Sequence, residues 1–335
     1  MAKIEIPDGY KSELDLRETQ IAIKEIKDYF QSILATELNL HRVTAPLFVA
    51  PESGLNDNLN GVERPVCFDV KEHGRNLEVI HSLAKWKRYA LGKYGFHEGE
   101  GLYTDMNAIR RDEETDNVHS IYVDQWDWEK IITKEDRTKC TFHSTVKKIY
   151  EALKITELHM SNLYDYIHCI LPEKIYFITS QELEDKFPEL DPKDREYEIT
   201  RLKGAVCIEK IGGKLRSGEP HDGRAPDYDD WTLNGDILVF YPVLDMALEI
   251  SSMGIRVDKD SLRSQLEEAG CPERAKLPFQ RAVINEEIPF TIGGGIGQSR
   301  LCMFYLRKAH IGEVQVSEWP EETVNYAFEH GVTIL

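Results

Sequence analysis

Apolar residues recur every three or four positions between residues 14 and 38, the spacing that places side chains on one face of a helix. The apolar residues of this stretch are Leu14, Ile21, Ile26, Tyr29, Phe30, Ile33, Leu34 and Leu38. Further helices are expected at 144–166 and, after a run of glycines, at 298–306. The chain therefore begins with a long amphipathic helix that has one apolar face to bury.

Short runs rich in apolar and β-branched residues predict strands elsewhere in the chain. These runs cover 66–70, 77–81, 102–110, 120–126, 174–179, 205–211, 236–241 and 243–251, and an extended segment broken by Pro46 covers 41–49. Many of the strands follow one another directly instead of alternating with helices. This order favours an α+β fold, with a mostly antiparallel sheet flanked by helices, in a single domain spanning 1–335.

The composition favours a soluble globular protein over a membrane protein or a nucleic-acid-binding protein. Hydrophobic residues make up 41% and charged residues 30% of the 335 residues, as in soluble globular proteins. No apolar run approaches the roughly 20 residues that cross a bilayer, and residues 1–10 do not resemble a secretory signal, so we expect a cytoplasmic protein. The net charge of −18 argues against a large nucleic-acid surface. The six cysteines lie far apart and are expected to be reduced, mostly buried thiols.

The glycine run at 291–301 is the first candidate for chemistry. Glycine lets a backbone approach a ligand closely, and Arg300 is expected in the first turn of the following helix, beside free backbone N–H groups. An arginine in this position suits a phosphate or a nucleotide ring. The run matches neither the GxGxxG motif nor the P-loop motif, and the alternative interpretation is a tight strand-to-helix turn.

Polar residues also share one face of the predicted strand at 119–128. Gln125 and Asp127 lie on one face of that strand, while Trp126 and Trp128 lie on the other. Polar side chains on a face otherwise suited to burial usually mark a site. The alternative is the solvated face of a hairpin at the sheet edge.

An oxygen-rich strand pair is the third candidate. Asp236 is expected to open one strand and Glu249 to end the next, which would bring the two carboxylates together near the hydroxyl of Ser252 or Ser251. Such a set suits Mg²⁺ carrying ATP phosphates. The preceding run at 223–231, with one arginine and three aspartates, is on its own equally typical of a solvated loop.

Two further segments carry weaker signals. A predicted strand ends near Ser82, and a basic helix follows it. In this helix Lys85 and Arg88 share a face and Lys87 points away. A basic turn at the surface would show the same pattern. The Asn-Asp-Asn sequence at 56–58 is, taken alone, an ordinary loop.

Several long strings that include these residues resemble the aspartate–ammonia ligase family, the AMP-forming asparagine synthetases that use ammonia. The strings lie at 79–88, 100–104, 122–129, 224–231, 249–256 and 291–301. The resemblance runs from about residue 16 to the C-terminus, and it implies the catalytic fold of class II aminoacyl-tRNA synthetases. Residues 1–15 are then an N-terminal extension that could be flexible, and the segment 231–234 is shorter than in bacterial relatives.

The resemblance implies an enzyme that converts L-aspartate, ATP and ammonia into L-asparagine, AMP and diphosphate through a β-aspartyl-adenylate. It also implies Mg²⁺ as the cofactor and a cytoplasmic homodimer with no nucleic-acid or membrane partner. Simple chemistry agrees with this route. Ammonia cannot displace oxide from a carboxylate, so the β-carboxylate must first gain a good leaving group.

Individual roles follow from the same resemblance. Asp57 would accept a proton from ammonium, Arg110 would grip the α-phosphate, and Gln125 would orient the β-carboxyl oxygen. The aspartate site would comprise Ser82, Lys87, Asp127, Asp229 and Arg256. The ATP site would comprise Arg110, Asp236, Glu249, Ser252, Gly295 and Arg300, with Asp236 and Glu249 as ligands of Mg²⁺. Lys87 is preferred here, although the helical-face argument favours Lys85.

Two alternatives stay open. A relative of aspartyl- or asparaginyl-tRNA synthetases would share the adenylate step but pass the aminoacyl group to tRNA, which the acidic net charge and the short chain disfavour. A non-catalytic, synthetase-like regulatory subunit would have a degraded ATP site. The predicted ATP-site residues are all present, which disfavours that alternative.

Overall fold

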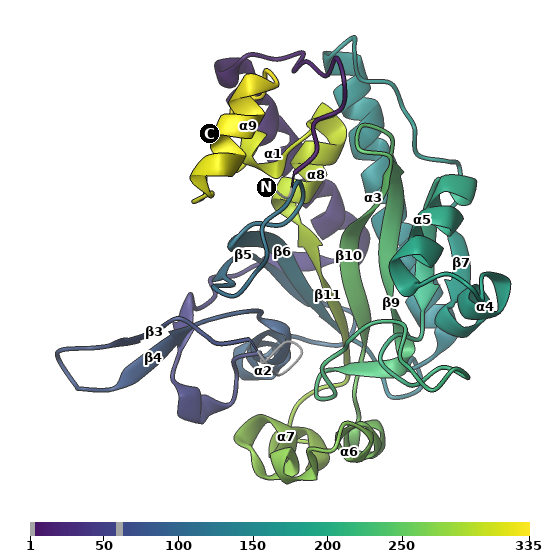
Figure 1. The fold of residues 1–335 in the computed structure, drawn as a ribbon. Coiled ribbons are helices and arrows are strands. Elements are labelled where there is room, and N and C mark those ends of the chain that lie inside the picture. Colours follow the sequence, from purple (N-terminus) through teal and green to yellow (C-terminus); the bar gives the residue numbers. More distant parts are fainter. Residues whose placement is uncertain (1–3, 58–62) are drawn as a thin grey trace.

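A computed structural model describes residues 4–57 and 63–335, and an eight-stranded sheet lies at its centre (Figure 1). In spatial order the strands are β1 (Leu40–Arg42), β5 (Gly101–Ile109), β6 (Tyr122–Ile131), β11 (Thr291–Gly297), β10 (Met246–Arg256), β9 (Asp229–Tyr241), β8 (Ala205–Glu209) and β7 (Tyr176–Thr179). Strands from both halves of the chain therefore meet at the centre of the sheet, where β6, β11 and β10 are neighbours.

The sheet is mixed, which corrects the expectation of a mostly antiparallel sheet. The pairs from β5 across to β8 are antiparallel, but β1 pairs with β5, and β7 with β8, in parallel. Parallel neighbours need a crossover connection. The helices α4 (Ser180–Lys186) and α5 (Pro192–Lys203) supply the crossover between β7 and β8. The sequence pattern did not distinguish these outer strands from the central ones.

Helices α1 (Leu16–Leu38), α3 (Lys139–Leu163) and α8 (Gln298–Leu306) contribute to one large core together with the central strands. Helix α1 begins at the N-cap Asp15, which forms a capping box with Glu18, and ends at Asn39 in the left-handed conformation. Its buried residues are Thr19, Ala22, Ile26, Phe30, Leu34 and Leu38. Ile21, which we placed on the apolar face, is 57% exposed.

A smaller sheet lies to one side of the main sheet (Figure 1). It consists of β2 (Phe48–Val49), β4 (Asn76–Val79) and β3 (Cys67–Asp69), and the short helix η1 (Pro51–Ser53) follows β2. Helix α2 (Ala84–Tyr94) begins soon after β4. Residues 80–83, between β4 and α2, therefore connect the smaller sheet to the helix beside the main sheet.

The remaining elements surround the sheet. These are α6 (Lys259–Glu268), η2 (Pro272–Lys276), α7 (Pro278–Ile284), η3 (Ile311–Glu313) and α9 (Glu321–Glu329). The two ends of the chain lie side by side, because Ile4 and Ile6 are buried against Ala327 and Val332 (Figure 1). Most of the segment predicted to be a flexible extension, residues 4–15, is thus described and contributes to this small core. Among the described helices, none has the length and apolar character needed to cross a membrane.

The strands that carry the acidic candidates are longer than the sequence pattern suggested. β9 begins at Asp229, seven residues before Asp236, and β10 continues beyond Glu249 to Arg256. Both acidic residues therefore lie within strands and not at their ends, and Asp236 is directly opposite Ser252 in the register. The six cysteines are free thiols, but only Cys207 and Cys302 are buried, so the expectation of mostly buried thiols is wrong.

Candidate active site

Strand β11 is the floor of the candidate site, and its glycines allow neighbouring side chains to cross it. A Cβ atom at Gly293 would lie 1.9 Å from Glu129 Oε2, and one at Gly295 would lie 2.5 Å from Gln125 Oε1. Neither glycine has a positive φ angle, so close approach and not an unusual torsion requires glycine here. Helix α8 begins directly after β11 and has Arg300 in its first turn, as predicted.

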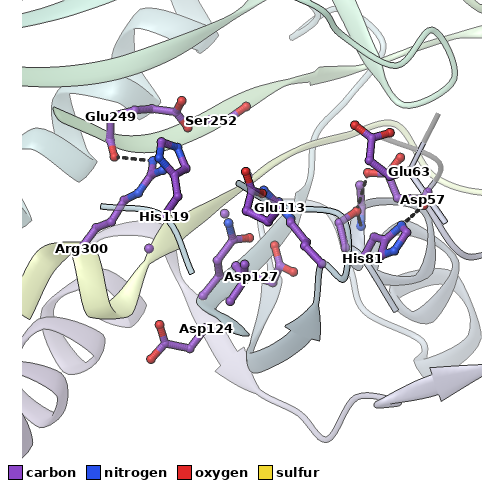
Figure 2. Close-up of a pocket in the computed structure, with 18 of the residues that line it drawn as sticks. Asp57, Glu63, His81, Glu113, His119, Asp124, Asp127, Glu249, Ser252 and Arg300 are labelled. Carbon is purple, nitrogen blue, oxygen red and sulfur yellow. Dashed lines mark hydrogen bonds and ion pairs between the residues drawn. The ribbon is translucent and has the colours of Figure 1, made fainter. Parts of the chain in front are cut away.

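A cavity of about 450 Å³ opens beside this floor (Figure 2). It brings together nearly all the residues predicted for the site. The predicted residues that line it are Asp57, Ser82, Lys87, Arg110, Gln125, Asp127, Asp229, Glu249, Ser252, Arg256, Gly295 and Arg300. Asp236 is the exception, because it does not line the cavity. The geometry groups these residues, and their individual roles stay predictions.

Lys87 and Asp127 form a buried ion pair at the inner wall. Lys87 Nζ donates to Asp127 Oδ1 at 2.7 Å and to the backbone oxygen of Gly294 at 2.8 Å. Burial lowers the pKa of Lys87, against the opposing attraction of Asp127. The second oxygen of Asp127, Oδ2, is buried without a partner among the described residues. Asp127 is thus able to accept a hydrogen bond from a ligand in the cavity.

Arg256 is held between two carboxylates at the same wall. Its Nε and Nη2 atoms donate to Glu129 at 2.7–3.1 Å, and Nη1 donates to Asp229 Oδ1. Burial would raise the pKa of Glu129, but attraction to Arg256 outweighs it, and the pKa lies below its ordinary value. Sequence analysis missed Glu129. The signal was available, because Gln125, Asp127 and Glu129 alternate along β6 and share one face.

The predicted metal ligands are only partly accessible. Arg224 Nη2 donates to both oxygens of Asp236, at 2.7 and 2.8 Å, and Arg224 Nη1 donates to Ser252 Oγ. Burial raises the pKa of Asp236 to about 6; Arg224 opposes this shift and the nearby charge of Glu249 adds to it. Glu249 and Ser252 line the cavity directly. Arg224 was expected in a loop, and its contact with Asp236 was not predicted.

Arg300 and Arg110 bring positive charge to the cavity. Arg300 Nη1 donates to the backbone oxygen of Glu249 at 3.1 Å (Figure 2), and its Nε donates to the backbone oxygen of Val118. Arg110 Nε is buried with no partner among the described residues, and Nη1 lies 3.7 Å from Glu113 Oε2. The hydrogen-bond partners of Arg300 are neutral carbonyl groups. Burial would raise the pKa of Glu249, but attraction to Arg300 and other nearby cations outweighs it, and the pKa lies below its ordinary value. The two arginines together suit an anionic ligand at this end of the cavity.

Asp57 lies at the opposite end of the cavity from Arg300 (Figure 2). Its position depends on Asn56, whose Oδ1 accepts from the backbone N–H groups of Asp57 and His81, both at 2.9 Å. Ser82 Oγ donates to Asp57 Oδ2 at 2.7 Å. The third residue of the Asn-Asp-Asn sequence, Asn58, lies outside the described residues. The loop is thus fastened to the segment after β4.

The orientation of helix α2 shows which of the two candidate lysines, Lys85 or Lys87, lines the cavity. Lys87 lines the cavity, as the resemblance implied, whereas Lys85 lies 3.5 Å from Asp227 Oδ2 outside it. Arg88 donates to the backbone oxygens of Pro289 and Val257 at 2.8 and 2.7 Å. Lys85 and Arg88 lie on one side of the helix, as predicted, but that side faces the structure around α7 and not the cavity.

The fold around this cavity is that of the class II aminoacyl-tRNA synthetases. The asparaginyl-tRNA synthetase of Pyrococcus horikoshii, complexed with asparaginyl-adenylate, is similar with a TM-score of 0.62 and 14% identity over 90% of this chain and 70% of that chain. The enzyme of the same name from Entamoeba histolytica gives a TM-score of 0.60 and 13% identity over 90% of this chain and 67% of that one. At these identities the likeness concerns the fold alone.

The sequence defines the family more narrowly. The profile of the aspartate–ammonia ligase family matches residues 17–331. The aspartate–ammonia ligase of Ruminiclostridium cellulolyticum is 62% identical over 330 residues, 98% of each chain. That of Clostridium perfringens (strain 13) is 61% identical over 336 residues, the full length of both chains. The chain therefore belongs to the aspartate–ammonia ligase family, and it is an enzyme.

Replacing Glu129 by glutamine should destabilise the protein. Arg256 and Glu129 are 2% and 0% exposed, and the variant leaves a buried guanidinium with only Asp229 as its anion. The expected loss in the free energy of unfolding is about 3–5 kcal/mol, measured by denaturant titration. Glu198→Gln, which removes one member of an exposed ion pair with Arg201, is the control and should unfold nearly like the wild type. Equal stability of the two variants would contradict the prediction.

Proposed function

We propose that this enzyme synthesises L-asparagine from L-aspartate and ammonia, with ATP converted to AMP and diphosphate through a β-aspartyl-adenylate. The observation that supports this most strongly is that the predicted aspartate, ATP and nitrogen-donor residues, all except Asp236, line one cavity in a chain of the aspartate–ammonia ligase family. Formation of an adenylate needs the carboxylate and the α-phosphate side by side, and a single cavity allows this.

The inner wall has the charges that an amino acid with two carboxylates requires. The free oxygen of Asp127 suits the α-ammonium group of aspartate, and Asp229 adds a second negative charge nearby. Lys87 and Arg256 bring positive charge for the α-carboxylate, and Ser82 would contribute only if its hydroxyl group turned away from Asp57. We assign the orientation of the β-carboxyl oxygen to Gln125, whose amide lies next to the glycine floor. Aspartate bound in this way would direct its β-carboxylate away from the wall.

ATP would bind at the end of the cavity that contains Arg300 and Arg110. Arg110 is assigned to the α-phosphate and Arg300 to the nucleotide, next to the close-packed backbone of Gly295. Attack on a phosphate ester in line with its leaving group gains most from positioning and from fixed positive charge. Both arginines provide that charge without a covalent step of their own.

Mg²⁺ matches the chemistry of the neighbouring oxygen donors. Glu249 and Ser252 face the cavity and would hold it, and Asp236 becomes available only when Arg224 moves. The ion, when bound with ATP, neutralises phosphate charge. Among the described residues there is no cluster of three or more histidine, cysteine or acidic side chains able to enclose a metal alone. The ion is therefore expected to bind together with the nucleotide.

The nitrogen donor would bind at the end of the cavity with Asp57. At neutral pH ammonia is mostly ammonium, which has no lone pair for attack. Asp57 is buried, faces the cavity and provides negative charge, so we assign to it the binding of ammonium and the acceptance of a proton from the nitrogen. Ser82 would orient this carboxylate through its hydrogen bond.

We also propose a cytoplasmic homodimer, in line with the family resemblance. Leu16 and Ile21 of α1 are 52% and 57% exposed, so this helix has apolar surface that a partner subunit would cover.

The products of the reaction test this function directly. The pure protein is incubated with aspartate, MgATP and ammonium, and asparagine, AMP, ADP and diphosphate are quantified. We expect asparagine, AMP and diphosphate in equal amounts. ADP and phosphate would indicate an acyl-phosphate route. Aspartate-dependent exchange of diphosphate into ATP without asparagine would favour a relative of the tRNA synthetases, and tRNA-dependent consumption of ATP would confirm that alternative.

Asp57→Ala should separate the two halves of the reaction. The variant keeps the residues assigned to aspartate and ATP, so aspartate-dependent exchange between diphosphate and ATP should continue. Asparagine synthesis should fall at least about 10²-fold, the contribution typical of a proton acceptor. Loss of both activities would show that Asp57 is needed for activation and not specifically for the nitrogen donor.

Arg300→Ala should weaken the binding of ATP by at least about tenfold, since it removes a charge-assisted hydrogen bond worth about 1.5–3 kcal/mol. Binding is measured by isothermal titration calorimetry with MgATP. Arg263→Ala on the exposed side of α6 is the matched control and should bind as the wild type does. Unchanged affinity in Arg300→Ala would exclude the end of the glycine strand as the nucleotide site.

A further inference from the structure

His81 lies beside Asp57 and has no role in the reaction described so far. It follows β4, is 1% exposed, and lines the cavity (Figure 2). Its backbone N–H group donates to Asn56 Oδ1, which also binds the backbone N–H group of Asp57. One asparagine side chain thus fixes the imidazole and the carboxylate relative to each other.

The hydrogen bond of the ring determines which nitrogen carries hydrogen. His81 Nδ1 lies 3.0 Å from the backbone carbonyl oxygen of Asp57. A carbonyl oxygen only accepts hydrogen bonds, so Nδ1 is the donor. In the neutral ring Nε2 then has no hydrogen and keeps its lone pair. The ring is therefore set up to accept a proton at Nε2.

Nε2 has no hydrogen-bond partner among the described residues, although it is buried. An unpaired buried acceptor typically costs about 1–3 kcal/mol, and such atoms need an explanation, for example a ligand. Asp57 and Glu63 line the same cavity and bring negative charge. An open acceptor next to carboxylates suits a small cation with N–H groups. Ammonium is the cation of this kind in the proposed reaction.

The proposed reaction requires two protons to leave the same nitrogen. Ammonium loses the first and gains a lone pair, which attacks the activated carbonyl carbon. The C–N bond forms, and the C–O bond to phosphate breaks with its electron pair leaving on AMP. The nitrogen then carries three hydrogens and must lose a second proton to become the amide. One carboxylate can accept only one of these protons.

We infer that His81 is a further catalytic residue, whose Nε2 accepts the proton that ammonium loses before attack, while Asp57 holds the cation and accepts the second proton. This inference rests on the proposed function. An imidazole is a stronger base than a carboxylate, which suits it to the harder first transfer, from ammonium itself. After AMP leaves, His81 and Asp57 each lose the accepted proton to solvent and are ready for the next turnover.

His81→Asn is the decisive variant. The asparagine amide can still donate to the carbonyl oxygen of Asp57, but it has no basic nitrogen in place of Nε2. Aspartate-dependent exchange between diphosphate and ATP should stay close to the wild-type rate. Asparagine synthesis from ammonium should fall about 10²–10⁴-fold. His143→Asn, in which a histidine that binds Glu209 outside the cavity is replaced, is the control and should retain both activities.

Hydroxylamine distinguishes proton acceptance from a structural role. It is uncharged at neutral pH and loses only one proton on forming aspartyl hydroxamate, so Asp57 alone suffices. His81→Asn should therefore lose much less activity with hydroxylamine than with ammonium. An equal loss with both nucleophiles, a parallel loss of exchange, or no loss at all would overturn the inference. His81→Gln should give the same pattern and serves if His81→Asn does not fold. Absence of exchange in the wild type would instead contradict the proposed function.

Discussion

The ion pairs of Arg256 are the interaction on which the rest of the site depends. Arg256 lies on β10, while its partners Glu129 and Asp229 come from β6 and β9. Strand β11 lies between β6 and β10, and Glu129 reaches across it only because Gly293 has no side chain. The glycine run is thus required by a buried guanidinium as well as by any ligand. The ion pairs of Arg256 join β6, β10 and β9 across β11, so the shape of the cavity depends on four neighbouring strands.

Buried charges of this kind restrict what the cavity can accept. Removing an ion from water is costly, and the charges at the wall are paired so that little is left uncompensated. The atoms without partners among the described residues are therefore informative. Five such atoms belong to described residues that line the cavity, namely Asp127 Oδ2, Arg110 Nε, His81 Nε2, Arg224 Nε and Gln315 Oε1. Under the proposed function, the first three would offer an acceptor for the aspartate ammonium group, a donor for a phosphate, and an acceptor for ammonium.

Sequence reasoning succeeded where a single periodic pattern determines the outcome. The first turn of α8 was predicted from the end of the glycine run, and the alternation along β6 separated Gln125 and Asp127 from the core residues Trp126 and Trp128. Twelve of the thirteen residues expected for the site, named largely through the family resemblance, also line one cavity, and their roles stay predictions. These features depend on local geometry or on long strings of sequence.

The contacts that sequence reasoning missed depend on pairing between distant segments. Arg88 and Lys85 share a helical face, but only the position of α2 shows which face points to the cavity. The role suggested for His81 could not be inferred from its neighbours in sequence, because the carbonyl group that fixes its tautomer belongs to Asp57, 24 residues earlier. The parallel outer strands were missed for the same reason.

Arg224 shows how one such contact changes the chemistry expected from a motif. Two carboxylates and a hydroxyl on adjacent strands suggest a cation site, and in this structure the cation is the guanidinium of Arg224. Even with Arg224 bound, burial raises the pKa of Asp236 to about 6, and the nearby charge of Glu249 adds to this shift. A divalent ion has twice the charge in a smaller volume. If it arrives with ATP, as proposed, it would both satisfy the carboxylates and release Arg224 toward the phosphates, so binding of metal and nucleotide would depend on each other.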